Sequence, residues 1–248
     1  MSPELTIAIF IFIFGILIGS FLNVVIYRIP KGESIVFPSS KCQSCQTPLK
    51  WYHNVPIFSW LFLRGKCGFC AEKISIQYPL IELFTGMIAV VLFYKLGLVW
   101  YLPFVFAVFT LLLALTIIDL KEMVAYDSLN LLALAVAIIS PTPIDALQNA
   151  LIAVGGFYLL REYLSYFLNK EAMGEGDIIV AGTMGAVLGF PLFFYAVFLS
   201  AILAIVPSLL TKDKDKAIPY IPFLALATFI VYIFDTQTHQ VVEYIIYG

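Results

Sequence analysis

The chain has 248 residues, of which 62% are hydrophobic and 12% are charged. Soluble globular domains carry charges on roughly a quarter of their residues, so this composition excludes an ordinary soluble domain. The formal net charge of −2 comes without a long basic stripe and argues against nucleic acid as a partner.

Eight apolar runs follow one another along the chain. A helix needs about 20 apolar residues to cross a bilayer, and the fourth and sixth runs are shorter than that. A Gly-Phe-Pro turn separates the sixth run from the seventh. The runs cover residues 5–27, 78–98, 100–118, 128–140, 144–167, 178–188, 191–210 and 220–234. The sequence therefore predicts an all-α polytopic membrane protein with about eight transmembrane helices.

The basic residues predict the orientation of these helices. Lys and Arg gather in the odd-numbered connections, whereas the even-numbered connections and the tail hold only Lys95. Positive residues stay on the cytoplasmic side, so both termini are expected outside and the long first connection inside. The first run lacks a basic leader region and a small-residue cleavage site, and it is expected to be a retained helix.

All four cysteines lie in that first connection, as Cys42-x-x-Cys45 and Cys67-x-x-Cys70 with 21 residues between the pairs. The spacing is close to that of zinc ribbons, and four thiolates leave no open position for catalysis. We therefore predict a structural zinc site that stabilises a loop too small for its own core. Two disulfides are the alternative, which a reducing compartment disfavours. A redox pair and an iron-type site also stay open, and His53 is interpreted as a neighbour of the site rather than a ligand.

Two aspartates lie beside apolar runs on one predicted membrane face. Asp119 ends the third run, and Asp177 closes a Gly-Glu-Gly-Asp turn before the sixth. A carboxylate beside hydrocarbon is costly unless it has a function. Two neighbouring carboxylates share one proton, so one can activate water while the other donates to a peptide carbonyl. Gly174 and Gly176 are expected to position substrate through positive φ or close backbone approach. The alternative is that both aspartates only cap or end helices, as Asp127 is expected to do for the fourth helix.

Four short segments occur in one order along the chain: GSFLNVVIYRIP at 19–30, LKWYHNVPIFSW at 49–60, QYPLIEL at 77–83 and GEGD at 174–177. Together with Asp119 and the cysteine pairs, they resemble the type IV prepilin peptidases, which are bifunctional leader peptidases and N-methyltransferases of the GxGD aspartyl protease class. The chain departs from the family pattern at Tyr126, Ile179 and Ile221, where proline, lysine and glycine are usual.

The resemblance implies an activity and its partners. Asp119 and Asp177 would be the catalytic carboxylates of an endopeptidase that removes the basic leader of type IV prepilins or type II secretion pseudopilins after a glycine. The new N-terminal residue would then be methylated from S-adenosylmethionine. Glu82, at the cytoplasmic entry to the second helix, is a candidate to bind an ammonium group or the cofactor, although a helix-end glutamate is more often an interface residue. The implied location is the bacterial inner membrane, with the four-cysteine loop and both aspartates on the cytoplasmic side.

Three segments are expected from these observations: the first transmembrane helix at 1–29, the four-cysteine loop at 30–77, and a seven-helix peptidase core at 78–248. Two other functions stay open. The aspartates of a transporter or channel would form a proton or cation site, for which polar midplane residues and broken helices would be expected. A non-enzymatic assembly scaffold would need neither carboxylate.

Overall fold

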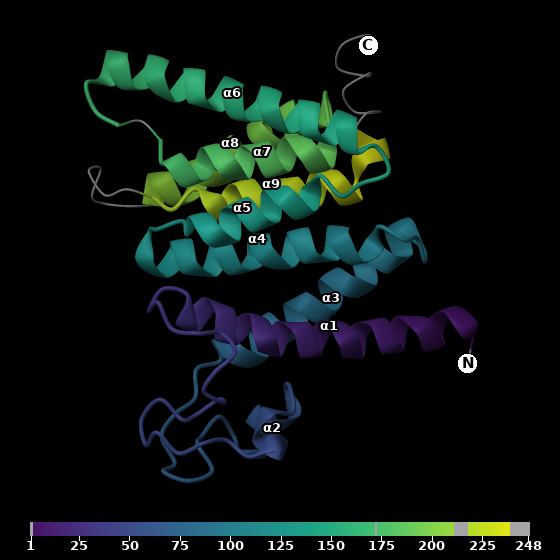
Figure 1. Cartoon of the computed structure of the whole chain (residues 1–248), viewed down its shortest axis with the longest axis vertical. Coiled ribbons are helices and arrows are strands. Elements are labelled where there is room, and N and C mark those ends of the chain that lie inside the picture. The colour runs from purple at the N-terminus through teal and green to yellow at the C-terminus, as the bar shows by residue number, and fades with distance from the viewer. Residues whose placement is uncertain (1, 172, 211–217, 239–248) are drawn as a thin grey trace. The chain divides into compact units, whose positions relative to one another are not determined.

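The computed structural model describes residues 2–171, 173–210 and 218–238. Helices dominate these residues, and the chain forms two compact units, residues 1–99 and 100–248 (Figure 1). The three-segment division made from the sequence differs from these units and stays a prediction.

The first unit is built on an antiparallel pair, α1 (Pro3–Arg28) and α3 (Gln77–Leu96). A Cβ at Gly15 would lie 2.8 Å from Gly86 Cα, and one at Gly19 would lie 2.7 Å from Glu82 Cα. Four residues further along α1, the Asn23 amide donates to the carbonyl of Tyr78 at 3.1 Å. Small residues at four-residue spacing thus let the two backbones approach closely, as in membrane helix pairs generally.

The connection between α1 and α3 contains η1 (Trp51–Asn54), α2 (Phe58–Phe62) and two antiparallel bridges, Lys41 with Pro48 and Lys66 with Lys73. Buried Arg28 ties the start of this loop to the helix pair, because its guanidinium donates to the carbonyls of Ser34 and Pro38 at 2.8 and 2.7 Å.

A γ-turn centres on Ile57 in the same loop. Its φ and ψ are 62° and −53°, and the N–H of Phe58 donates to the carbonyl of Pro56 at 2.6 Å. This turn is strained for a β-branched residue. Such a conformation persists only where the surroundings hold it, and here the Ile57 N–H donates to the Glu82 carboxylate at 2.7 Å.

The second unit contains six helices within its described residues. Helix α4 packs against α5 and α9, α7 packs against α5, α6 and α9, and α8 packs against α9. Their core is mainly aliphatic and includes Leu112, Leu115, Val180 and Leu224, each at most 1% exposed. The bounds are α4 Leu102–Glu122, α5 Asp127–Ala137, α6 Pro143–Leu168, α7 Glu175–Leu188, α8 Leu192–Leu210 and α9 Ile221–Ile233.

All eight predicted runs are helical. Among the described residues, five helices are long and apolar enough to cross a membrane: α1, α3, α4, α6 and α8. Helices α5, α7 and α9 have 11, 14 and 13 residues, or roughly 16–21 Å at about 1.5 Å per residue, against a hydrocarbon core of about 30 Å. The multi-pass class is confirmed, and a count of eight crossings stays a prediction.

The predicted N-cap at Asp127 is wrong. Tyr126 occupies the cap position of α5 with an extended backbone, and Asp127 is the first helical residue, exposed and without a capping bond. The φ of Tyr126 is −83°, close to the range of about −50° to −80° that proline adopts. The departure from proline at this position therefore leaves the backbone path unchanged.

Candidate functional site

The four cysteines come together as predicted. Their Sγ atoms all lie within 4.8 Å of one another, and none forms a disulfide. Each pair sits in a similar turn, in which the residue after the second cysteine, Gln46 or Ala71, has positive φ and donates its N–H to the first cysteine's carbonyl. The four cysteines are Cys42, Cys45, Cys67 and Cys70.

The thiols of this cluster differ in acidity. Hydrogen bonds from the side chain and backbone of Thr47 lower the pKa of Cys45 to about 6. The N–H of Glu72 would lower the pKa of Cys70, but burial and the three neighbouring thiols outweigh it and raise that pKa to about 11. Thiolates so close together repel one another without a cation between them, and a tetrahedral metal ion that prefers sulfur fits this donor set.

His53 is not among these donors. Its ring packs edge-on against Phe69 at 5.1 Å between centroids, beside Gly68 in the second cysteine turn. This position agrees with the interpretation of a neighbour rather than a ligand.

Asp119 lies in the last turn of α4 and is 6% exposed. One oxygen, Oδ2, accepts the backbone N–H of Ile221 at 3.2 Å. Ile221 is the first residue of α9, and only its backbone reaches the carboxylate. The departure from glycine at this position therefore keeps the donor and fills the surrounding space with an apolar side chain that is 2% exposed.

Asp177 lies in the first turn of α7, ahead of the apolar run that starts at Ile178. Burial and the nearby charge of Asp119 raise its pKa to about 6, although the N–H of Gly174 donates to the carboxylate and acts in the opposite direction. The two aspartates predicted from the sequence are therefore neighbours, and at most one of them is readily ionised in mildly acidic solution.

The helix-cap alternative for Asp177 holds in part. The cap residue is Gly174, which has no side chain, and Asp177 reaches back from the third helical position to its N–H. This is one half of a capping box. Capping leaves the second carboxylate oxygen available, so it does not exclude chemistry.

The expectation of positive φ at the two glycines is wrong. Gly174 has φ −69°, and Gly176 is helical. At Gly176 the close neighbour is the chain itself, because a Cβ would lie 2.2 Å from the Cβ of Ala125; close approach of a substrate to these glycines stays a prediction. The Gly176 carbonyl also accepts the buried Asn130 amide at 2.9 Å. The contact is with the α4–α5 connection, so Gly176 places α7 and with it Asp177.

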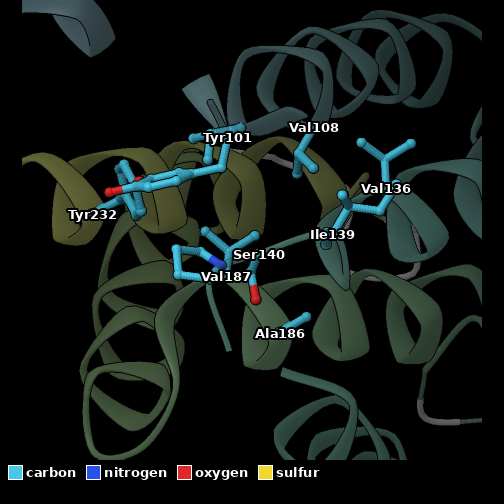
Figure 2. A pocket seen from close by; sticks show the side chains of 11 residues that line it. Tyr101, Val108, Val136, Ile139, Ser140, Ala186, Val187 and Tyr232 are labelled. Atoms are coloured by element: carbon cyan, nitrogen blue, oxygen red, sulfur yellow. The ribbon is translucent and has the colours of Figure 1, made fainter. Parts of the chain in front are cut away.

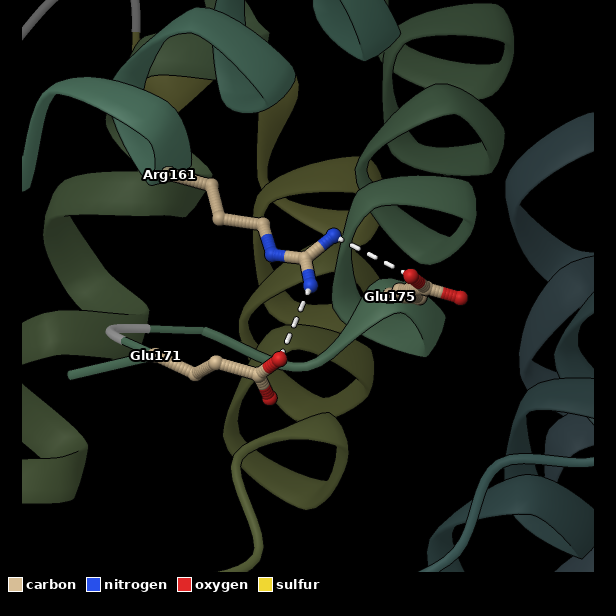
Figure 3. Close-up of polar contacts among 3 residues, drawn as sticks. All are labelled: Arg161, Glu171 and Glu175. Atoms are coloured by element: carbon tan, nitrogen blue, oxygen red, sulfur yellow. Dashed lines mark hydrogen bonds and ion pairs between the residues drawn. The ribbon is translucent and has the colours of Figure 1, made fainter. Parts of the chain in front are cut away.

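Arg161 of α6 is a further residue of this region. Its guanidinium lies 3.3 Å from Glu175 and 3.9 Å from Glu171 (Figure 3). Both glutamates are exposed, so each pair contributes little stability, but Glu175 is the second residue of the GEGD turn. This contact could have been predicted from the sequence, because Arg161 is a charged residue inside a predicted helix that precedes the acidic GEGD turn.

Glu82 lies in the first unit and is 6% exposed. Its carboxylate accepts the Ile57 N–H and the Ser20 hydroxyl. Sequence reasoning placed Glu82 at a helix entry and missed its role in holding the strained turn.

A cavity of about 90 Å³ lies elsewhere in the second unit, between Tyr101, Ser140 and Tyr232 (Figure 2). Tyr101 directly precedes α4, whereas Asp119 lies 17 residues beyond Leu102, or about 26 Å along the helix. The cavity is therefore separate from the aspartates.

Neighbouring carboxylates at the ends of apolar helices are the arrangement of a membrane-embedded aspartyl peptidase. Two family models match the chain: the bacterial peptidase A24 N-terminal domain over residues 13–96, and the type IV leader peptidase family over residues 106–209. The chain belongs to the prepilin leader peptidase/N-methyltransferase family.

Three relatives, each called a prepilin leader peptidase/N-methyltransferase, illustrate the match. The one from Neisseria gonorrhoeae is 30% identical, over 94% of this chain and 92% of its own length. That from Pectobacterium carotovorum is 32% identical, over 86% and 88%. That from Myxococcus xanthus is 38% identical, over 73% of this chain and 56% of the relative. No solved structure matches the chain. The comparisons give no support to a transporter or channel.

Proposed function

We propose that this protein removes the leader of prepilins or pseudopilins by aspartyl peptidase chemistry at Asp119 and Asp177. The observation that carries the proposal is the packing of α4, with Asp119 in its last turn, and of α7, with Asp177 in its first turn, against the same helix α9. In this arrangement the charge of Asp119 acts on the Asp177 carboxylate. In the sequence, 57 residues lie between Asp119 and Asp177. Because each carboxylate is costly beside apolar helices, their proximity in the fold favours a function over chance.

Asp119 and Asp177 each accept one backbone N–H, from Ile221 and Gly174, so that bond does not distinguish them. We place the shared proton on Asp177, whose pKa is raised to about 6, and propose that Asp119 takes a proton from the attacking water. Asp177 holds the shared proton below about pH 6 and donates it to the oxygen of the scissile carbonyl. Collapse of the tetrahedral intermediate breaks the C–N bond, and the amine leaves with a proton from the pair. Cleavage should decline as rising pH ionises Asp177.

The test is leader removal from a co-expressed prepilin, measured by mass spectrometry. Asp119→Asn and Asp177→Asn should each abolish cleavage while the protein stays inserted in the membrane. Asp127→Asn is the matched control, because this aspartate is exposed and starts α5, and it should cleave normally. Substantial activity in either of the first two variants would refute the paired-carboxylate assignment.

We also propose that the cysteine cluster holds zinc. The four Sγ atoms within 4.8 Å match a tetrahedral thiolate set. Bound there, zinc would hold the two turns together and supply no reactive position. The proposed location is the bacterial inner membrane, with this loop and both aspartates on the cytoplasmic side. Thiols stay reduced on that side, and the leader of a prepilin substrate would lie there as well.

The methyl transfer is proposed from the name of the relatives, with S-adenosylmethionine as donor. Glu82 is kept as a candidate contact for the new amine or for the cationic donor. Its carboxylate already accepts two hydrogen bonds, and further lone pairs remain for a cation.

A further inference from the structure

A buried asparagine on α5 contacts the peptide unit that leads into Asp177. The side-chain amide of Asn130 donates from Nδ2 to the Gly176 carbonyl at 2.9 Å. That carbonyl and the N–H of Asp177 belong to one planar peptide unit. The hydrogen bond therefore fixes the plane that ends at the Cα of Asp177.

Asn130 is itself held in place. It is the fourth residue of α5 and has no exposed surface, and its backbone N–H donates to the carbonyl of Tyr126 at 3.0 Å. Ala125, directly before Tyr126, is the residue whose Cβ lies against Gly176. One short segment thus holds Gly176 twice, by a packing contact at its Cα and by a hydrogen bond at its carbonyl.

Hydrogen-bond satisfaction alone does not explain this asparagine. A helical carbonyl already accepts the N–H four residues further on, so the Gly176 carbonyl does not need a second donor. Asn130 also leaves its own Oδ1 buried without a partner among the described residues. An apolar residue of similar size would fill the space without that cost. The opposite amide orientation would set two oxygens against each other at 2.9 Å, so the donor faces Gly176.

From this geometry we propose that Asn130 is a positioning residue of the aspartate pair, whose amide N–H fixes the Gly176–Asp177 peptide and so orients the Asp177 carboxylate. Asn130 acts on substrate only through Asp177. The inference rests on the proposed peptidase function.

Asn130→Leu separates the hydrogen bond from the packing, because leucine keeps about the same size and removes the donor. The kcat for leader cleavage should fall roughly tenfold at every pH, the rate equivalent of one hydrogen bond. KM should stay unchanged, because the substitution leaves the surface that meets the substrate intact.

Asn130→Asp places a carboxyl group at the same position. Protonated, that group donates to the Gly176 carbonyl as the amide does; ionised, it repels the carbonyl and adds negative charge beside Asp177. Burial keeps it protonated in acidic solution, so cleavage should approach the wild-type rate there and fall more steeply than in wild type as the pH rises. The other charged or titratable groups around Asp177 are the same in every variant: Asp119 on α4, Asp127 on α5, Arg161 on α6, Glu175 on α7 and Tyr220 before α9.

The control is Asn149→Leu, the same substitution against the opposite end of α7. A Cβ at Gly189, directly after α7, would lie 3.4 Å from Nδ2 of Asn149, and Gly189 is about 18 Å from Asp177 along the helix. This variant should keep the wild-type rate and pH profile.

The assay is cleavage of one leader peptide by purified full-length protein from pH 5 to 9, with thermal unfolding of each variant. Asn130→Asp carries the test even where Asn130→Leu does not fold. A wild-type kcat in Asn130→Leu, no recovery of Asn130→Asp in acidic solution, or an equal loss in Asn149→Leu would overturn the positioning role and leave the peptidase standing. Activity in the Asp119→Asn or Asp177→Asn variant would instead remove the peptidase assignment itself.

Discussion

Replacing Gly176 with alanine should damage catalysis far more than stability. The new Cβ would lie 2.2 Å from the Cβ of Ala125, roughly 1.5 Å inside an ordinary carbon–carbon contact. The obstacle is a short side chain next to backbone, which cannot swing aside. The first turn of α7 must therefore move by about 1 Å, and Asp177, the next residue, moves with it.

Two magnitudes follow from this clash. Alanine in a helix gains about 1 kcal/mol over glycine, and overpacking costs about 1–3 kcal/mol, so the net loss of stability should be at most about 2 kcal/mol. A displacement of about 1 Å at a reacting group costs on the order of 100-fold in rate. Cleavage should therefore drop by about two orders of magnitude in a protein that still folds.

The assay is leader cleavage by membranes containing equal amounts of each variant, together with thermal unfolding in detergent. Gly155→Ala is the matched control, because a Cβ at that helical position on α6 meets nothing within 4 Å. It should retain full activity. If the Gly176→Ala variant cleaved the leader at the wild-type rate, the contact between Gly176 and Ala125 would not be what positions Asp177.

Two further predictions concern the first unit. Cys70→Ser should lower bound zinc from about one ion per chain and make the loop sensitive to protease, as metal analysis and limited proteolysis would show, whereas full metal content would exclude a four-thiolate site. Glu82→Gln should spare cleavage but lower methylation of pre-cleaved pilin, because an amide loses a charged hydrogen bond of about 1.5–3 kcal/mol. Undiminished labelled methyl transfer would make Glu82 only the support of the Ile57 turn.

The helices, the cysteine cluster and the meeting of the two aspartates could be predicted because each leaves a local trace in the sequence. Long apolar runs, paired cysteines and a charge beside an apolar run are visible without a partner. The contacts around them depend on residues distant in the chain. The hydroxyls of Tyr220 and Ser200 lie 2.9 Å apart, although nothing near either residue in the sequence marks the other. Asp119 accepts a backbone N–H that any residue except proline would supply at position 221.

The glycines before Asp177 show a second limit of prediction from sequence. Two glycines before an aspartate can indicate a left-handed turn or a close contact, and the sequence does not distinguish them. At Gly176 the contact with Ala125 decides in favour of packing. Similarly, the strained φ of Ile57 could not be predicted, because a β-branched residue disfavours it and the Glu82 carboxylate that accepts its N–H lies 25 residues away in the chain.

Both aspartates accept a hydrogen bond from the beginning of a helix, Asp177 at α7 and Asp119 at α9. The positive ends of two helix macrodipoles therefore converge on one pair of carboxylates. That field favours negative charge where burial opposes it, which allows one carboxylate to stay ionised in an apolar environment. It also means that an alanine at either position would remove the proposed reactive group and loosen a helix end together, whereas asparagine keeps the acceptor oxygen and changes only the ionisable group.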